Sequence, residues 1–359
     1  MSGINLFTGG TLKVLQECIA SLAALGKNYK IIALVHNEKL LFPYDNVEYI
    51  SFPKSRKSYF FRLYYEYFRF KKISKELKPD YWISMHDTTP NVCAAKRYVY
   101  CHNPFPFYKA GINVLCVQPS IFLLTLFTNY IYRINIKKNT YVIVQQEWIR
   151  KAFKKKFSIN NILVALPDDS NFPDPVLSDD KKTKKVSFFY PATPMVHKNP
   201  EIIGEAVKIL EKDDSLDFDV VLTMNGTENK YANRFYQKYK KLKNLRFVGY
   251  LNREEMNRYF QNSDCLLFPS KVETWGLPIT EAKTYNKPIL VSNLPYAYET
   301  VGLYDKAKFF DPDNAEELAG IMNDFIKNHS IEFDKTKEVQ YEEPVVKGWN
   351  ELVKFMIRE

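Results

Sequence analysis

Short apolar runs alternate with amphipathic stretches along almost the whole chain. This alternation is typical of α/β domains, in which helices connect the strands of a parallel sheet. In the first half, the apolar residues of the intervening stretches recur at three- and four-residue spacing, as on one face of a helix. The predicted strands there are 4–7, 30–36, 81–84, 98–101, 141–145 and 162–165, and the predicted helices are 11–25, 59–77 and 147–157.

A polar segment, LPDDSNFPDPVLSDDKKTKK at 166–185, divides the chain. Its content of Pro, Asp, Ser and Lys is typical of a linker. After it the alternation restarts, and the last stretch, VVKGWNELVKFMIRE, has the pattern of a separate amphipathic helix. The sequence predicts two Rossmann-like doubly wound domains, at 1–168 and 182–340, and a C-terminal helix within 343–359 that packs on the first domain.

The charge balance narrows the class of partner. The 359 residues include 51 Lys and Arg against 41 Asp and Glu, a net charge of +10 that favours a phosphorylated substrate, an acidic membrane surface or a nucleic acid. Five scattered cysteines without a C-x-x-C pair indicate neither a disulfide framework nor a zinc site, and they fit a reducing compartment. The N-terminus, MSGINLFTGG, lacks the pattern of a signal peptide, so we expect a cytoplasmic protein.

Two segments of the first half have the composition of membrane-facing helices. The apolar window 114–132 is about long enough to span but contains Gln118, Pro119 and Asn129, so we expect a buried or interfacial helix. The segment 54–78 combines nine Lys or Arg with eight aromatic residues. It suits an anionic bilayer or a nucleic acid, or else a domain helix whose aromatic side chains pack on the sheet and whose lysines are solvated.

A loop with two glutamates occupies the position where an open α/β sheet binds ligands. FPSKVETWGLPITEAK, 268–283, follows the strand predicted at 264–268 and leads into a helix that begins near Pro278. The N–H groups at a helix start suit a phosphate or a hydroxyl-rich ligand. Glu281 can accept hydrogen bonds from a vicinal diol such as a ribose, and Glu273 can reach a second group of the same ligand. Either carboxylate can instead simply stabilise the helix dipole.

This region resembles the E-x7-E segment of retaining glycosyltransferases of the GT-B fold, the glycosyltransferase group 1 family. The flanking FFYPATPMVHKNP (188–200), NLRFVGYLNREEMNRYF (244–260) and FFDPDNAEELAGIM (309–322) are similar to the family's donor-lysine loop, nucleobase-side segment and closing helix. The resemblance covers most of 186–325. It implies a GT-B architecture of two Rossmann-like domains facing a central cleft, with a nucleotide-sugar donor on the C-terminal domain.

The resemblance implies donor-site roles for individual residues. Glu281 would bind the ribose hydroxyls, Glu273 would face the donor sugar, and Lys198 would neutralise the departing diphosphate. One position departs from the pattern, because many relatives carry an arginine about five residues before the lysine and this chain has Thr193, which puts a second diphosphate-binding cation in doubt. The other donor-binding residues that it implies are Tyr250, Thr274, Trp275, Gly276 and Leu277.

In the first domain, LFTGGTLKVLQECIASLAAL resembles the family's glycine loop between its first strand and helix. Gly9 and Gly10 would let the backbone approach the donor phosphates. YVYCHNPFPFY ends a strand in a His-Asn-Pro loop, and the resemblance makes His102 the histidine that meets the donor sugar. The acceptor-side candidates are Asn103 and His86.

The implied reaction moves a glycosyl group from a nucleoside diphosphate sugar to an acceptor hydroxyl with retained anomeric configuration, and its catalytic residues are His102, Glu273 and Lys198. A double displacement needs a carboxylate nucleophile, and no residue is clearly that group. The resemblance implies instead a front-face route in which the departing phosphate oxygen accepts the acceptor proton. No D-x-D motif follows a predicted strand, so we expect no metal ion and no cofactor besides the nucleotide-sugar co-substrate.

For the acceptor we expect a saccharide or lipid-linked saccharide of surface polysaccharide assembly, of the lipopolysaccharide O-antigen or capsule type, used at the inner face of the plasma membrane, and no nucleic-acid partner. Another GT-B enzyme stays open as an alternative, because fold does not fix function. An epimerase would need no acceptor, and a phosphorylase would need free phosphate. A basic nucleic-acid-binding protein would bind oligonucleotides in a salt-sensitive way, but it gives no reason for the two glutamates.

Overall fold

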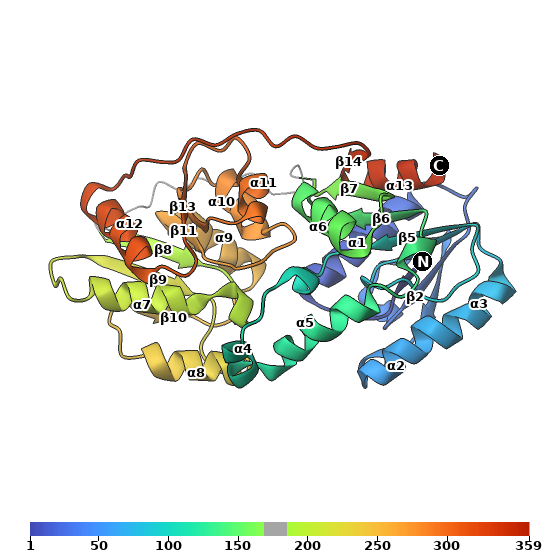
Figure 1. Cartoon of the computed structure of the whole chain (residues 1–359), viewed down its shortest axis with the longest axis horizontal. Coiled ribbons are helices and arrows are strands. Elements are labelled where there is room, and N and C mark those ends of the chain that lie inside the picture. Colours follow the sequence, from blue (N-terminus) through green and yellow to red (C-terminus); the bar gives the residue numbers. More distant parts are fainter. Residues whose placement is uncertain (169–184, 359) are drawn as a thin grey trace. The chain divides into compact units, whose positions relative to one another are not determined.

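The computed structural model describes residues 1–168 and 185–358, which fall into two compact units (Figure 1). Most of the predicted linker, 169–184, lies outside the described residues. One segment differs from the predicted domains, because 107–125 packs with the C-terminal half of the chain rather than with the N-terminal half. Unit 1 contains Met1–Pro106, Leu126–Asp168 and Tyr341–Glu359, and unit 2 contains Phe107–Thr125 and Asp169–Gln340.

Unit 1 is built on an eight-stranded sheet whose described strands are all parallel, in the order β14-β7-β6-β5-β4-β1-β2-β3. The strand order reverses between β1 and β4, which makes this pair the topological switch point of the sheet. The strands are β1 (Ser2–Gly3), β2 (Ile31–Val35), β3 (Val47–Ser51), β4 (Tyr81–Ser84), β5 (Lys96–Tyr100), β6 (Tyr141–Val144), β7 (Ile162–Leu166) and β14 (Val345–Lys347). The helices that wholly or partly belong to unit 1 are α1 (Gly9–Ala23), α2 (Tyr59–Tyr64), α3 (Phe70–Leu77), α5 (Pro119–Ile131), α6 (Glu147–Phe157) and α13 (Gly348–Arg358).

The first strand is two residues long and precedes the predicted one. We expected it at 4–7, but β1 is Ser2–Gly3, where Ser2 pairs with Leu34 of β2. A Cβ on Gly3 would lie 2.7 Å from Leu15 Cδ1, so the glycine lets α1 pack close to the strand. Ile4 is buried beyond the end of the strand. The apolar residues that predicted the strand therefore belong to the core without pairing.

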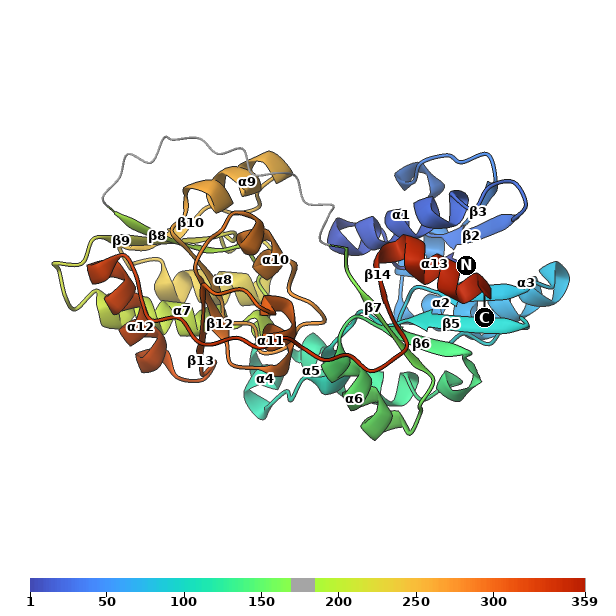
Figure 2. The ribbon, with the colours of Figure 1, turned by 90° about the horizontal axis from the view of Figure 1, so that it is seen from above.

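The C-terminal segment packs on unit 1, and its first three residues are a strand rather than the start of the predicted helix. Val345 and Val346 are β-branched and pair with Val164 and Ala165 of β7. Gly348, at φ 75°, then turns the chain into α13. Helix α13 lies beside α1 (Figure 2), where the Trp349 Nε1 donates a hydrogen bond to Glu17 Oε2 at 3.2 Å.

Unit 2 is built on a six-stranded sheet whose described strands are also all parallel, in the order β10-β9-β8-β11-β12-β13. Its switch point lies between β8 and β11, where Phe188 is the register partner of Cys265. The strands are β8 (Val186–Tyr190), β9 (Phe218–Leu222), β10 (Leu245–Phe247), β11 (Cys265–Phe268), β12 (Ile289–Ser292) and β13 (Ala307–Phe310). The helices are α4 (Ile112–Val117), α7 (Pro200–Leu210), α8 (Lys230–Tyr239), α9 (Arg253–Asn262), α10 (Leu277–Thr284), α11 (Pro295–Val301) and α12 (Ala315–Asn328).

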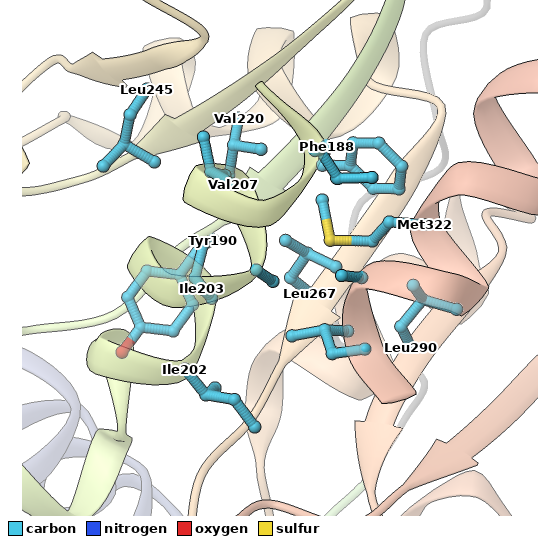
Figure 3. Packing of buried hydrophobic residues seen from close by; sticks show 14 of the residues in the cluster. Phe188, Tyr190, Ile202, Ile203, Val207, Val220, Leu245, Leu267, Leu290 and Met322 are labelled. Atoms are coloured by element: carbon cyan, nitrogen blue, oxygen red, sulfur yellow. The ribbon is translucent and has the colours of Figure 1, made fainter. Parts of the chain in front are cut away.

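The core of unit 2 fills the space between its sheet and the helices α7 and α12. Figure 3 shows Ile203 and Val207 of α7 packed with Phe188 of β8 and with Met322 of α12. Their side chains are fully or almost fully buried. This core fixes α7 against the sheet, so the loop between β8 and α7 has two rigid ends. Both units confirm the predicted α/β class with two parallel Rossmann-like sheets.

The apolar window 114–132 forms two helices, because the helical chain breaks where Gln118 precedes Pro119. Helix α4 ends at Val117, and α5 begins at Pro119. Within residues 1–168 and 185–358, no helix combines the length and the apolar character that crossing a bilayer requires.

Candidate functional site

The candidate donor site lies at the switch point of unit 2, where the loops after β8 and β11 leave neighbouring strands. The first loop carries Lys198 and the second carries Glu273. Lys198 Nζ lies 2.5 Å from Glu273 Oε1, and their side chains are 21% and 11% exposed. The structure thus brings together two residues that are 75 positions apart in the sequence and that were predicted to act on one ligand. A half-buried cation beside a carboxylate is an arrangement that can bind an anion and a hydroxyl group at the same place.

Backbone and side-chain contacts hold the lysine loop. Val196–Lys198 form a short 3-10 turn, and Tyr190 donates a hydrogen bond from its hydroxyl to the Lys198 carbonyl at 3.0 Å. Burial raises the pKa of the Tyr190 hydroxyl well above its usual value, so it stays a neutral donor. Asn199 follows at φ 56°, and its amide donates to the carbonyls of Pro269 (3.2 Å) and Pro312 (2.8 Å). The asparagine of the HKNP motif therefore joins three loops.

The glutamate loop is tied to the lysine loop and to helix α11. The backbone N–H of Lys271 donates to the His197 carbonyl at 2.8 Å. Burial lowers the pKa of His197 well below its usual value, and the neighbouring Lys198 charge lowers it further, so the imidazole stays neutral. Tyr296 of α11 donates its hydroxyl to the Ser270 carbonyl at 2.8 Å. The backbone directly before Glu273 is thus held by the lysine loop on one hand and by α11 on the other.

Helix α10 begins within the predicted motif. Gly276 has φ 93°, and a Cβ there would lie 3.2 Å from Ile279 and 3.3 Å from the Phe268 ring, so a glycine is required for both reasons. Trp275 is buried, and its Nε1 donates to Thr280 Oγ1 at 2.9 Å, which indicates a structural role for the indole. In the first turn, Pro278 has no N–H group and the Ile279 N–H donates to the Gly276 carbonyl at 2.9 Å, so few N–H groups of this turn can serve a ligand.

Glu281 lies on α10 and forms an ion pair with Arg253, the first residue of α9. The Glu281 side chain is mostly buried, whereas the arginine is half exposed. Sequence reasoning did not single out Arg253, although it stands in the NREE stretch used for the resemblance. Its position directly after the N-cap Asn252 was the available signal, because the N-cap fixes where the first helical residue stands.

Other residues predicted at the donor differ in their surroundings. Tyr250 is 89% exposed, and Leu277 is also exposed. Thr193, which stands where many relatives carry an arginine, is exposed in the loop after β8. Lys271 is a cation on the glutamate loop, and it forms an ion pair with Asp313. Among the described residues of the loops after β8 and β11, Lys198 and Lys271 are therefore the positively charged side chains.

The segment 107–125 supports the lysine loop from a distant part of the sequence. The backbone N–H of Val196 donates to Gln118 Oε1 at 3.1 Å, and the ring of Tyr108 lies edge-on to that of His197, with the ring centroids 6.1 Å apart. Arg234 of α8 donates to the Cys116 carbonyl at 2.9 Å. Sequence reasoning missed Gln118 as a site residue and treated it only as an interruption of an apolar helix.

In unit 1, His102 stands directly after β5, in a loop that a neighbouring carboxylate organises. Asp87 Oδ1 accepts hydrogen bonds from the backbone N–H groups of His102 (2.7 Å) and Asn103 (3.0 Å). Asp87 follows β4 and has φ 68°, an uncommon conformation outside glycine. It was missed in the sequence, where the polar pair His86-Asp87 after a strand was the signal. The roles of His102 and Asn103 toward donor and acceptor stay predictions.

His86 is fully buried, and its ring is bonded on both sides. Its Nδ1 lies 3.0 Å from Glu66 Oε1, and its Nε2 lies 2.9 Å from Ser2 Oγ. Glu66 is also buried and accepts from Arg62 Nε at 2.7 Å and from Thr88 Oγ1 at 2.5 Å. This geometry supports a structural role for His86. The acceptor contact that we expected stays a prediction.

Gly9 and Gly10 lie at the start of α1, after the switch-point strand β1 of unit 1. Gly9 has φ 57°, and a Cβ at either position would meet no heavy atom of the described chain within 4 Å. The backbone at this helix start is therefore open to a ligand, and a side chain at Gly9 would be strained. Contact of these glycines with donor phosphates stays a prediction.

Three comparisons relate this geometry to known proteins. Residues 178–342 match the family described as Glycosyl transferases group 1, and this range contains Lys198, Glu273 and Glu281. The chain is similar to the O-antigen chain mannosyltransferase RfbU of Salmonella typhimurium (strain LT2), with 22% identity over 233 residues that make up 64% of this chain and 60% of RfbU. The matches to curated relatives span 25% and 60% of the relatives' own lengths.

Solved structures share the fold over most of the chain. WaaG, a glycosyltransferase involved in lipopolysaccharide biosynthesis, has a TM-score of 0.64 at 14% identity, with 91% of this chain and 90% of WaaG covered. Alr3699/HepE of Anabaena in complex with UDP-glucose has a TM-score of 0.54 at 13% identity, with 91% and 89% covered. The two parallel-sheet units therefore have the fold of GT-B glycosyltransferases, and residues 178–342 are similar to the glycosyl transferases group 1 family.

Proposed function

We propose that this protein is a retaining glycosyltransferase that moves a sugar from a nucleoside diphosphate sugar to a hydroxyl of a saccharide or lipid-linked saccharide acceptor. The observation that carries the proposal is the Lys198–Glu273 ion pair at the switch point of unit 2, within the group 1 domain. Ligands of open α/β sheets bind at such switch points, beyond the carboxyl ends of the strands. The UDP-glucose bound in the structurally similar Alr3699/HepE supports a nucleotide sugar as the donor class.

Lys198 is the residue that would stabilise the leaving group. As the bond to the sugar breaks, negative charge develops on the diphosphate oxygens, and a fixed ammonium group at that place stabilises the transition state more than the ground state. In the structure described here its partner is Glu273. A diphosphate would share the ammonium with that carboxylate, so Lys198 stays placed by Glu273 while it contacts the donor. We propose that this cation and the backbone N–H groups of Trp275, Gly276 and Leu277 act without a metal ion.

Glu273 would bind hydroxyl groups of the donor sugar rather than attack it. A carboxylate oxygen that already accepts from an ammonium group is a poorer nucleophile than a free one. Retention would then follow a front-face route, in which an oxygen of the departing phosphate accepts the proton of the acceptor hydroxyl. The acceptor oxygen forms its bond to the anomeric carbon on the face that the phosphate leaves, so atoms and charge balance without a covalent intermediate.

Glu281 would bind the ribose of the nucleotide, with Arg253 holding its carboxylate in place. Lys271 is the residue that we propose as the second cation near the diphosphate, in place of the arginine that is absent at Thr193. It stands two residues before Glu273, and its backbone N–H is bonded to His197 beside Lys198. The similarity to an O-antigen chain mannosyltransferase supports a surface-polysaccharide acceptor.

A thermal-shift panel of UDP-, GDP-, ADP- and dTDP-sugars tests the donor site directly. A ligand at 100 times its Kd stabilises a protein by about 2.7 kcal/mol, which is readily measured as a rise in Tm. We expect one base to be clearly preferred and Glu281→Ala to reduce the shift, whereas Lys208→Ala, at an exposed lysine on α7, should leave it unchanged. If none of the four nucleotide sugars raises Tm, the proposed donor site is wrong.

Product analysis separates the enzyme classes. With the preferred donor labelled in its sugar, a transferase releases the nucleoside diphosphate only as fast as a glycosylated acceptor appears. An epimerase would convert the donor without an acceptor, and a phosphorylase would require free phosphate. The anomeric configuration of the product, measured by NMR, tests retention, and an inverted product would exclude the front-face route.

A further inference from the structure

The helix that runs through α2 and α3 (Figure 1) carries a row of solvent-exposed aromatic side chains. Phe60 is 72% exposed, Phe68 is 69% exposed, and Tyr64 between them is also exposed. Phenylalanine has no polar group that would favour water, so a row of this kind needs an explanation. We call Phe60, Tyr64 and Phe68, together with the exposed Tyr59, the aromatic ridge.

From Glu66 onward, the inward face of the same helix is packed in unit 1. Phe70 and Ile73 are buried in a cluster with Phe52 and Trp82. The rings of Phe52 and Phe70 pack edge to face, with centroids 5.6 Å apart. The helix therefore already has a packed core face, and the ridge is a separate face of it.

A π turn at Tyr65–Arg69 keeps the ridge in line. In an α-helix, residues four apart drift around the axis, so Phe60 and Phe68 would point about 80° apart. A π turn contains more residues, so the step from Tyr64 to Phe68 turns back against that drift. The result is visible in the stacking of these two rings, which lie at 18° to each other with centroids 6.0 Å apart.

The buried network at Glu66 accounts for the π turn. Glu66 is the second residue of that turn, and its carboxylate is fully buried, where it accepts hydrogen bonds from Arg62, His86 and Thr88. Three donors to one buried carboxylate fix its backbone position firmly. The hydrogen bonds of Glu66 and the packing of Phe70 thus hold the helix on its inward side, and the ridge faces outward.

Exposed cations surround the ridge. The segment 54–78 contains two carboxylates. Glu76 is exposed, whereas Glu66 is buried and paired. Large apolar rings with basic residues beside them are the composition of helices that lie in the head-group region of an anionic bilayer. The basic rim of the ridge consists of Lys54, Arg56, Lys57, Arg69, Lys71, Lys72, Lys75 and Lys78, all of them exposed.

We propose that the aromatic ridge and its basic rim are a docking surface for an anionic lipid bilayer, with the helix lying in the plane of the head groups. The rings would enter the boundary between head groups and acyl chains, and the rim would pair with lipid phosphates. Charge complementarity selects this occupant. A single helix with outward-facing phenylalanines lacks the groove that tracks a nucleic-acid backbone, so the observations favour the bilayer.

Vesicle flotation with the full chain tests the proposal. The probes are vesicles of phosphatidylcholine alone and vesicles with about one third phosphatidylglycerol. We expect binding to the anionic vesicles and a loss of about tenfold or more on phosphatidylcholine alone. Raising the salt from about 0.1 to about 0.5 M should weaken the binding strongly, because it screens the rim. Equal binding to both vesicles, or none to either, overturns the proposal.

Three sets of substitutions locate the surface. The variant Phe60→Ser, Tyr64→Ser, Phe68→Ser should reduce binding about tenfold or more, and so should Lys71→Glu, Lys72→Glu, Lys75→Glu, because each removes one of the two contributions. The matched control is Phe42→Ser with Leu303→Ser, which removes exposed apolar side chains from other places. All these positions are exposed, so Tm should stay unchanged, and the charge variant keeps the test valid if the serine variant fails to fold.

The other possible occupants give different results. A nucleic-acid surface would bind a single-stranded oligonucleotide in a fluorescence-anisotropy titration, with the same variants impaired and no flotation, which would overturn the proposal. If the ridge and rim variants still float with the anionic vesicles, the proposal is overturned as well. The flotation assay contains no nucleotide sugar, and the thermal-shift panel contains no lipid, so failure of the docking surface is distinguishable from failure of the proposed transferase.

Discussion

The guanidinium of Arg253 forms an ion pair with the carboxylate of Glu281, from the first residue of one helix to the body of the next. The arginine is half exposed and the glutamate mostly buried. The pair therefore restrains the direction of the Glu281 carboxylate, as the proposed contact with a ribose diol would require. Under that proposal the two residues share one binding function, and of the two only Glu281 belongs to the E-x7-E motif.

Removing either residue should weaken nucleotide binding to different degrees. Glu281→Ala deletes hydrogen bonds to a charged group, worth about 1.5–3 kcal/mol, and should raise the Kd for the nucleotide about tenfold to a hundredfold. Arg253→Ala leaves the carboxylate in place and removes one restraint on its direction, so its effect should be smaller. Isothermal titration with the preferred nucleoside diphosphate measures both. Glu254→Ala, on the same helix and exposed, is the control, and an unchanged Kd in Arg253→Ala would contradict the positioning role.

Substitutions in the Lys198–Glu273 pair should act on turnover more than on binding. Lys198→Ala removes a cation from the place where charge develops, and the loss expected for one such contact is about 10²–10³-fold in kcat. Glu273→Gln keeps the shape but loosens the hold on Lys198, so kcat should fall while the donor KM changes less. Initial rates at saturating acceptor separate the two constants. A pure rise in KM for both variants would show that the pair binds substrate and transition state equally.

The buried Glu66 makes a prediction about acid stability. Burial alone would raise its pKa, but the Arg62 charge and the bonds from His86 and Thr88 outweigh burial and lower the pKa to about 2. The folded state therefore favours the carboxylate over the acid more than the unfolded state does. This stability is fully present above the unfolded pKa of about 4.3 and is lost as the pH falls through the folded value, a contribution of about 3 kcal/mol.

Denaturant unfolding between pH 3 and pH 7 measures this contribution. Glu66→Gln should be less stable at pH 7 and should show a shallower loss of stability below about pH 4 than the parent chain. Glu76→Gln, exposed on the same helix, should follow the parent curve. If Glu66→Gln and the parent lose stability in parallel on acidification, the charged state of Glu66 is not what holds the network.

The parts of the site that the sequence predicted are those that follow from strand order. Lys198 follows β8 and Glu273 follows β11, and a doubly wound sheet places the loops after these two strands side by side. Apolar runs marked the strands, so the pairing of two residues 75 positions apart was foreseeable. The same reasoning brought His102 to the carboxyl end of β5, beside β4.

The residues that were missed depend on contacts that local patterns do not record. Asp87 acts through a left-handed backbone conformation, which no rule assigns to an aspartate in advance. Gln118 acts because 107–125 packs with unit 2, and nothing in its own apolar pattern indicates which unit it joins. The first strand was misplaced because Ile4 and Leu6 are buried without pairing. A buried loop and a paired strand have similar apolar patterns in the sequence. The close packing of α1 on Gly3, which places the strand at Ser2–Gly3, is seen only in the structure.

Gln118 should prove to be a positioning residue for Lys198. Its Oε1 accepts from the backbone N–H of Val196, two residues before the lysine. Gln118→Leu leaves that N–H without its partner and frees the loop to shift, and misplacement by about 1 Å at a reacting centre can cost about a hundredfold in rate. We therefore expect kcat to fall about tenfold or more. The global stability should change little, because the core of unit 2 lies between the sheet and the helices α7 and α12.

The conservative variant distinguishes positioning from general disruption. Gln118→Glu keeps an oxygen acceptor at the same reach, so it should restore most of the activity that Gln118→Leu loses. Gln237→Leu, an exposed glutamine on α8, is the control for the loss of an amide. Nucleotide affinity should be nearly equal in all three variants, because Glu281 and Arg253 lie on other elements. If Gln118→Glu is as impaired as Gln118→Leu, or if both retain the parent kcat, the hydrogen bond to Val196 does not position Lys198.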